Sequence, residues 1–186
     1  MFTNTRVLQW NHHTNYAVFI FENLLEKEQL DIVLNKTLEL TKQDTKKRKT
    51  NVQAHMTDFN ELNKHPEYMY LRDKIVSLLH TCCVLRSPHW GQISASEYII
   101  KDFWGMQHHK GDYTKIHAHS PNGYSGAFHV RCPGKNYMHF QDVQQKELLK
   151  DNCLYLFPAN FLHSVDKHQH DVSRVSIGIN LLVDLK

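Results

Sequence analysis

The second half of the sequence is a succession of short β-prone runs separated by turn residues, and this pattern limits the fold more than any other feature. The runs occupy residues 93–104, 113–119, 124–131, 137–140, 153–157 and 174–183. Short strands of this kind, rich in β-branched and aromatic residues, are typical of an antiparallel sandwich or barrel. We therefore expect a β core in the C-terminal half of the chain.

Two helices are expected ahead of this core. A β-prone run at residues 16–21 is followed by leucines at helical spacing, from Leu30 to Leu38, and a second helical pattern begins near Pro66. A chain of 186 residues suits one domain better than two. The predicted fold class is α+β: one domain over residues 1–186, with a helical part over about 1–88 packed against a β core over about 89–186.

Composition narrows the function classes only a little. Hydrophobic residues make up 41% and charged residues 22% of the chain, which is ordinary for a globular protein. The net charge of +3 is too small to indicate nucleic-acid binding by itself, although the basic cluster at residues 46–49 leaves a nucleic acid or another anionic partner open. No apolar run is long enough to cross a membrane and no secretory signal is recognisable, so we expect a cytoplasmic protein, in the host cytoplasm if a phage encodes it.

Cysteine and histidine are the side chains to test for metal binding. The cysteines lack the paired spacing of a zinc site, and we expect free thiols at Cys82, Cys83, Cys132 and Cys153. Fifteen histidines are unusual for this length, and histidine is the commonest metal ligand. Most are expected on the surface, among them His108, His109, His168 and His170, whereas His129 and His139 could face the interior.

Two histidines separated by one residue stand in the run at 113–119. His117 and His119 would share one face of a strand, because alternate strand residues point the same way. A third histidine, His163, follows an apolar run and a proline turn. Three imidazoles on one side of an ion leave its other side open, and non-haem Fe(II) oxygenases need this for O₂ and an organic co-substrate. These three histidines are the predicted metal ligands.

An arginine on the last predicted strand indicates what else such a site could bind. Arg174 offers a planar fork that can bind a carboxylate through two hydrogen bonds, and Ser176 follows on the same strand face. A surface ion pair is the ordinary alternative for a strand arginine. Because Arg174 follows His163 at a short distance in the chain, we favour a carboxylate clamp made by Arg174 and Ser176.

With these motifs, the sequence resembles the Fe(II)/2-oxoglutarate-dependent oxygenases, and among them the small phage and marine-bacterial ones with a His-x-His motif. The resemblance implies a double-stranded β-helix, or jelly roll, and a dioxygenase that uses Fe(II), 2-oxoglutarate and O₂. Its products would be succinate, CO₂ and an oxidised, most simply hydroxylated, organic or protein substrate that the sequence does not identify. The matching segments are Trp104, residues 110–113, His117 to His119, residues 125–130, Phe157-Pro158, residues 163–165, Arg174 and Asn180, with a further likeness at residues 50–57.

The resemblance also implies roles for individual residues. It places Arg174 on the distal carboxylate of 2-oxoglutarate with Ser176 assisting, and it adds Tyr113 and Asn180 as weaker candidates for the same pocket. The chain departs from the wider superfamily at His119, where that pattern has an aspartate or glutamate. Either three histidines bind the metal, which we prefer, or His119 turns away and water or substrate completes the shell.

Two other interpretations stay open. A cupin-type dioxygenase would keep a three-histidine iron without 2-oxoglutarate; Gly111 and Pro158 fit its motifs, but no glutamate follows His119 at the expected distance. A non-catalytic β-sandwich, serving as a binding module or a phage accessory protein, would have no reason to gather His117, His163 and Arg174 at one cavity.

Overall fold

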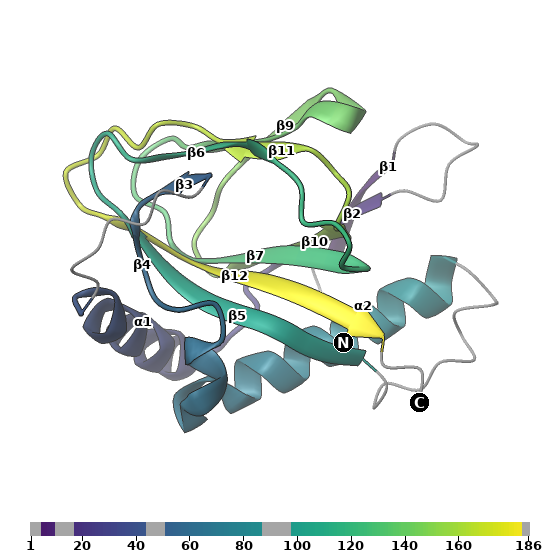
Figure 1. The fold of residues 1–186 in the computed structure, drawn as a ribbon, viewed down its shortest axis with the longest axis horizontal. Helices are drawn as coiled ribbons and strands as arrows, with labels where there is room; N and C mark the ends of the chain where they lie inside the picture. The colour runs from purple at the N-terminus through teal and green to yellow at the C-terminus, as the bar shows by residue number, and fades with distance from the viewer. Residues whose placement is uncertain (1–4, 10–16, 44–50, 87–97, 184–186) are drawn as a thin grey trace.

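Two antiparallel sheets face each other in the computed structural model, which describes residues 5–9, 17–43, 51–86 and 98–183 (Figure 1). Among these residues the larger sheet consists, in spatial order, of β1 (Thr5–Gln9), β2 (Ala17–Glu22), β10 (Cys153–Pro158), β7 (Tyr124–Arg131), β12 (Arg174–Val183), β5 (Tyr98–His108) and β4 (His55–Met56). The smaller sheet consists of β3 (Val52–Gln53), β6 (Tyr113–His117), β11 (His163–Val165), β8 (Tyr137–Phe140) and β9 (Gln145–Leu148).

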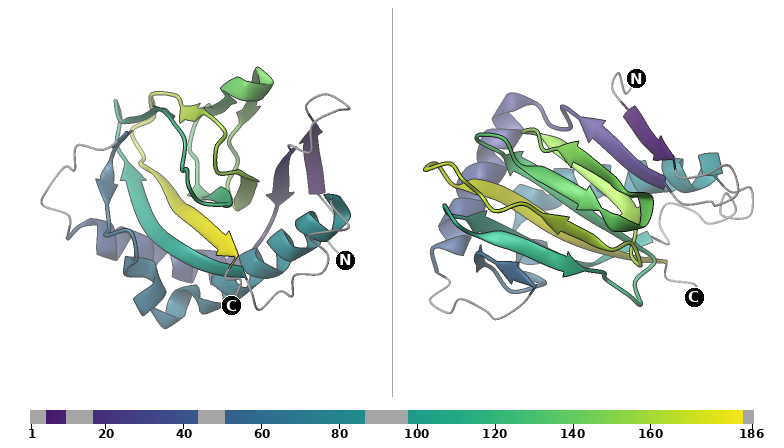
Figure 2. Two further views of the ribbon diagram at one scale, coloured as in Figure 1. Left: turned by 45° about the vertical axis from the view of Figure 1, so that its right-hand side comes forward. Right: turned by 90° about the horizontal axis from the view of Figure 1, so that it is seen from above.

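The helices cover the outer face of the larger sheet, as both views of Figure 2 show. They are α1 (Lys27–Thr41) and α2 (Met69–Arg86), with short 3₁₀ turns at Glu61–Lys64, Pro66–Tyr68 and Gln141–Val143. Pro66 stands at the first position of its turn, where a missing N–H costs nothing. In the described part of the chain, no helix is long and apolar enough to cross a membrane.

Side-chain alternation along the central strands gives the larger sheet two different faces. On β12, Val175, Ile177, Ile179 and Leu181 join the apolar core under the helices. The residues between them face the smaller sheet, and Arg174, Ser176 and Gly178 line a cavity there. Since alternate residues of a strand point to opposite faces, the ten residues of β12 supply apolar side chains to the core on one face and cavity-lining side chains on the other.

The predicted α+β fold, with helices packed against a β core, is confirmed. The strands at 124–131, 137–140 and 174–183 have the predicted bounds. The N-terminal part is less purely helical than predicted, because β1 and β2 extend the larger sheet and β3 and β4 add a short strand to each sheet. Of the predicted free thiols, Cys132 and Cys153 are buried and unbridged. The basic cluster at 46–49 lies outside the described residues.

Gly178 makes room for the indole of Trp104, its partner on β5. A Cβ at residue 178 would stand 2.2 Å from two atoms of that ring. We expect Gly178→Ala to displace Trp104 and to lower the free energy of unfolding by about 1–3 kcal/mol, the usual cost of overpacking, as measured by urea titration. Gly123→Ala is the control, because its Cβ would meet only the Leu181 carbonyl oxygen at 3.8 Å. Equal losses in the two variants would contradict this packing argument.

Candidate metal and anion site

Three imidazoles meet between the two sheets. His117 ends β6 and His163 begins the neighbouring β11, and the two residues are directly paired in the ladder. His119 follows two residues after His117. One ring nitrogen from each of the three histidines lies within 4.8 Å of the others. The three predicted metal ligands therefore converge, and together they can hold one metal ion.

His119 reaches this group by a different route from the predicted one. The sequence pattern placed it inside a strand, but β6 stops at His117. The His119 backbone N–H instead donates to the carbonyl oxygen of Ala159 at 2.7 Å, which fixes the chain just before the turn at Pro121. The rings of His119 and His163 stack with their centroids 5.1 Å apart. A backbone contact after the strand, rather than strand alternation, brings the third imidazole to the site.

Backbone carbonyls orient two of the imidazoles. His117 Nδ1 lies 2.8 Å from the carbonyl oxygen of Lys115, and His163 Nδ1 lies 2.9 Å from that of Phe161. A carbonyl oxygen can only accept, so both Nδ1 atoms carry the proton and both Nε2 atoms keep a free lone pair. A hydrogen bond of this kind fixes the tautomer of a metal-binding histidine. The two rings are thus set to bind through Nε2.

Burial also keeps the three rings neutral. It lowers the pKa of His119 to about 4 and that of His163 to about 3, with repulsion from His117 adding to the effect in each case. The pKa of His117 itself is lowered by burial. Metal ions compete with protons for imidazole nitrogen. At neutral pH the three histidines are therefore in their metal-binding form.

A narrow cavity of about 50 Å³ connects this triad to Arg174. His117, His119 and His163 lie in its wall, and so do Arg174 and Ser176 from β12. Gly126 and Ala127 of β7 also line it, and the small Ala127 side chain leaves room there, whereas a Cβ on Gly126 would point into the apolar core against Leu156. The triad and the predicted carboxylate clamp therefore share one cavity.

The guanidinium of Arg174 is buried with few hydrogen bonds to offset the loss of its hydration. Its residue is 1% exposed, Nη1 lies 3.4 Å from Asn136 Oδ1, and buried Nε has no hydrogen-bond partner among the described residues. Burial lowers the pKa of Arg174 to about 10, so it stays charged at neutral pH. Burying a charge without a counter-ion costs several kcal/mol. An anion entering the cavity would offset that cost.

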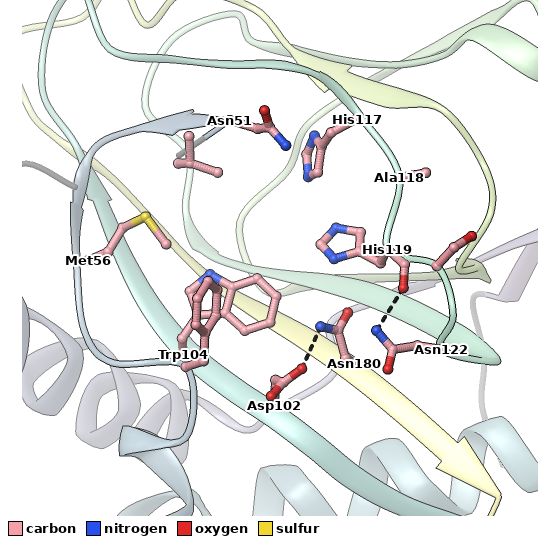
Figure 3. A pocket seen from close by; sticks show the side chains of 12 residues that line it. Asn51, Met56, Asp102, Trp104, His117, Ala118, His119, Asn122 and Asn180 are labelled. Carbon is pink, nitrogen blue, oxygen red and sulfur yellow. Dashed lines mark hydrogen bonds between the residues drawn. The ribbon is translucent and has the colours of Figure 1, made fainter. Parts of the chain in front are cut away.

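A wider outer pocket of about 280 Å³ opens on the other side of the triad (Figure 3). His117 and His119 form one wall and Trp104 lies opposite them. Asn180, predicted as a weak candidate for the co-substrate cavity, lies in this outer pocket and donates from Nδ2 to Asp102 Oδ2 at 2.8 Å. Tyr113, at the start of β6, is in the lining of neither cavity.

Two histidines that were predicted on the surface, His108 and His168, are buried, so the prediction was wrong for both. His108 is 2% exposed and belongs to the cavity wall next to Arg174, and His168 is fully buried behind it. His168 Nδ1 lies 3.0 Å from Asn136 Oδ1, the same oxygen that contacts Arg174. His129 does face the interior, while His139 is half-buried beside Asp166, at 2.8 Å. His108 stands four residues after Trp104 on β5 and therefore on the same face of the strand. This spacing was the sequence signal that could have predicted an inward position for His108.

The buried imidazoles predict a loss of stability in acid. An unfolded histidine has a pKa of about 6.5, whereas the folded values are about 4 for His119 and about 3 for His129 and His163. Between these limits only the unfolded chain takes up protons, so stability is fully present above pH 6.5 and falls as the pH drops toward 4. Each group contributes about 1.4 kcal/mol per pH unit. The free energy of unfolding of the metal-free protein, measured by urea titration, should fall by several kcal/mol between pH 7 and pH 5. A free energy that does not change with pH would contradict the burial of these rings.

No protein-family model and no curated protein matches this sequence. Solved structures do match its fold. A viral collagen prolyl hydroxylase from Paramecium bursaria Chlorella virus-1, in complex with 2-oxoglutarate, has 13% identity and a TM-score of 0.64 over 88% of this chain and 94% of its own. A prolyl hydroxylase from Trichoplax adhaerens, bound to a hypoxia-inducible-factor peptide, has 14% identity and a TM-score of 0.64 over 90% and 84%.

The epimerase SnoN, in complex with Fe³⁺, alpha-ketoglutarate and nogalamycin RO, has 8% identity and a TM-score of 0.69 over 89% of this chain and 78% of its own. The similarity to all three proteins extends over nearly the whole chain at very low sequence identity. This similarity therefore shows the fold and not the activity. The chain has the double-stranded β-helix fold that these 2-oxoglutarate-dependent proteins share.

Proposed function

We propose that this protein is a non-haem Fe(II)- and 2-oxoglutarate-dependent dioxygenase. The observation that carries the proposal is the meeting of two groups in one cavity: a triad of neutral imidazoles and the under-compensated guanidinium of Arg174. An open triad suits an iron that must also accept O₂ and a co-substrate. A buried guanidinium at the far end suits the second carboxylate of a dicarboxylate co-substrate.

The residues present fit both groups. His117, His119 and His163 would hold Fe(II), and Arg174 with Ser176 would hold the distal carboxylate of 2-oxoglutarate. Bound together, Fe(II) and 2-oxoglutarate would supply O₂-dependent oxidation of the substrate with release of succinate and CO₂. The chain itself would fix the length and direction of the co-substrate and exclude water around it. Its structural neighbours support this assignment, since their names include a 2-oxoglutarate complex and a complex with Fe³⁺ and alpha-ketoglutarate.

Substrate would occupy the outer pocket, on the side of the triad away from Arg174. Among the described residues in its lining, Asp102 is the only aspartate, glutamate, lysine or arginine. Two residues of this lining have a buried polar atom without a hydrogen-bond partner within the described ranges, the donor Nε1 of Trp104 and the acceptor Oδ1 of Asn122. These features favour a substrate, organic or protein, that is not anionic at this point and that forms hydrogen bonds. We also propose, from the sequence motifs alone, that the protein is related to the small phage and marine-bacterial oxygenases.

The same convergence weighs against the two other interpretations. A cupin-type dioxygenase without 2-oxoglutarate would leave the Arg174 charge buried without use. A β-sandwich that only binds a partner would have no need for three neutral imidazoles around one point. Arg174 is therefore the residue that separates the three hypotheses.

The direct test is co-substrate turnover. Protein reconstituted with Fe(II) in air should convert 2-oxoglutarate slowly to succinate even without its substrate, as quantified by mass spectrometry with ¹³C-labelled 2-oxoglutarate. The His163→Ala variant, prepared identically, gives the background. Succinate at background level from a protein that binds both Fe(II) and 2-oxoglutarate would contradict the proposed reaction.

A further inference from the structure

Two histidines outside the triad flank the guanidinium of Arg174. His108 on β5 is the direct cross-strand partner of Arg174, and His129 on β7 is the partner of Ser176. In adjacent antiparallel strands, the Cβ atoms of directly paired residues lie about 5 Å apart on the same face of the sheet. Both histidines line the same narrow cavity as Arg174 and Ser176. The deep end of the cavity thus carries one guanidinium, one hydroxyl and two imidazoles.

Neither imidazole forms a hydrogen bond within the described part of the chain, although the His129 ring packs edge-to-face on Tyr155, with the ring centroids 5.4 Å apart. His108 and His129 are each 2% exposed, and in the described part of the chain both ring nitrogens of both residues lack a hydrogen-bond partner. Buried polar groups are nearly always hydrogen-bonded, and each one left without a partner costs about 1–3 kcal/mol. At least one nitrogen of each ring is an N–H donor, and two such donors without a partner, beside one guanidinium in one cavity, indicate a ligand that brings acceptor oxygens.

The charge state of the two rings determines how many hydrogen bonds they can donate. Burial, with the adjacent Arg174 charge adding to it, lowers the pKa of His129 to about 3 and also lowers that of His108. Both rings are therefore neutral and present one N–H donor each. A carboxylate has about four acceptor positions, and one guanidinium satisfies at most two of them. Neutral donors, the two imidazoles and the Ser176 hydroxyl, can satisfy the positions that Arg174 leaves without adding further positive charge around it.

We propose that His108 and His129 are further binding residues for the distal carboxylate of the co-substrate, and that they make the site selective for a 2-oxo dicarboxylate over a 2-oxo monocarboxylate. This inference rests on the proposed function, because it assumes that the 2-oxo end is bound at the histidine triad. It adds two residues that the sequence motifs did not indicate. The cavity then recognises the distal carboxylate by four side chains from three neighbouring strands.

The test compares two ligands of the same chain length on metal-loaded protein under anaerobic conditions. 2-Oxoglutarate carries the distal carboxylate and 2-oxopentanoate lacks it. In His108→Leu and His129→Leu, we expect the affinity for 2-oxoglutarate to fall by about 10- to 100-fold, the usual effect of losing a hydrogen bond to a charged group. The affinity for 2-oxopentanoate should stay within about threefold. The conservative variants His108→Gln and His129→Gln, which keep a donor, should recover part of the loss and serve if leucine impairs folding.

His139→Leu is the matched control, since His139 is half-buried in the smaller sheet, bonded to Asp166 and outside this cavity. Its affinity for both ligands should equal that of the unmodified protein. Equal losses for both ligands in the His108 or His129 variants would overturn the inference, because they would show a general deformation of the cavity. So would unchanged 2-oxoglutarate affinity. Failure of the unmodified protein to bind 2-oxoglutarate at all would instead overturn the proposed function, and this inference with it.

Discussion

Replacement of Arg174 by leucine is expected to weaken 2-oxoglutarate binding by about 30-fold to more than 1000-fold while metal binding is retained. Removing one partner of a buried, hydrogen-bonded charge pair costs about 2–5 kcal/mol or more, and Arg174 is the one cationic side chain in the described lining of the cavity. Calorimetric titration of the metal-loaded protein with 2-oxoglutarate, under anaerobic conditions, would measure the loss.

The same variant should not destabilise the ligand-free protein. A buried ion replaced by an apolar side chain is often neutral or stabilising by about 1–4 kcal/mol, and among the described residues the guanidinium of Arg174 has one long hydrogen bond, at 3.4 Å, to offset its burial. Urea unfolding without ligand should therefore give equal or higher stability. Lys110→Ala is the control for binding, because Lys110 pairs at the surface with exposed Asp171. Marked destabilisation with unchanged 2-oxoglutarate affinity would make Arg174 a structural residue.

Replacement of His163 by alanine is expected to abolish metal binding, with an affinity loss of at least about 100-fold. His163 is 4% exposed and the most buried of the three histidines, and its Nδ1 donates to the Phe161 carbonyl oxygen, so its Nε2 is fixed in orientation. Two imidazoles would remain, and one of them, His119, lies beyond the end of β6. The visible spectrum of Co(II)-loaded protein would report the coordination directly.

His119→Asp provides the contrasting variant. It restores the carboxylate that the wider superfamily has at this position, so we expect a site that still binds metal. His139→Ala should leave the Co(II) spectrum unchanged, because His139 contacts Asp166 away from the triad. Metal binding by His163→Ala at the original affinity would remove His163 from the site. Complete loss in His119→Asp would show that the pocket is built for imidazole alone.

Strand periodicity explains why much of the site could be predicted from the sequence. The spacing of Arg174 and Ser176 predicts one face of a strand, and the structure confirms it, because both line the cavity while Val175 between them lies in the apolar core. The paired positions of His117 and His163 follow from strands β6 and β11 lying side by side. The first feature is a local pattern set by the two-residue period of one strand, whereas the second depends on which strands are neighbours.

The remaining features depend on contacts that no local pattern encodes. The inward position of His108 results from the pairing of β5 with β12, and the burial of His168 results from the Asn136 side chain that lies between it and Arg174. Strand β11 has only three residues, and β3 and β4 have two each, so none of them shows an alternation long enough to recognise. Which strands are neighbours decided these features, and strand order is not visible in composition or spacing.

The most direct test of the account is an anaerobic titration of the Fe(II)-loaded protein with 2-oxoglutarate, followed in the visible region. Chelation of the iron by the 2-oxo acid at the triad predicts a weak charge-transfer band that grows to saturation, and that is absent in His163→Ala. A protein that binds Fe(II) tightly yet develops no band at saturating 2-oxoglutarate would contradict the shared cavity for metal and co-substrate.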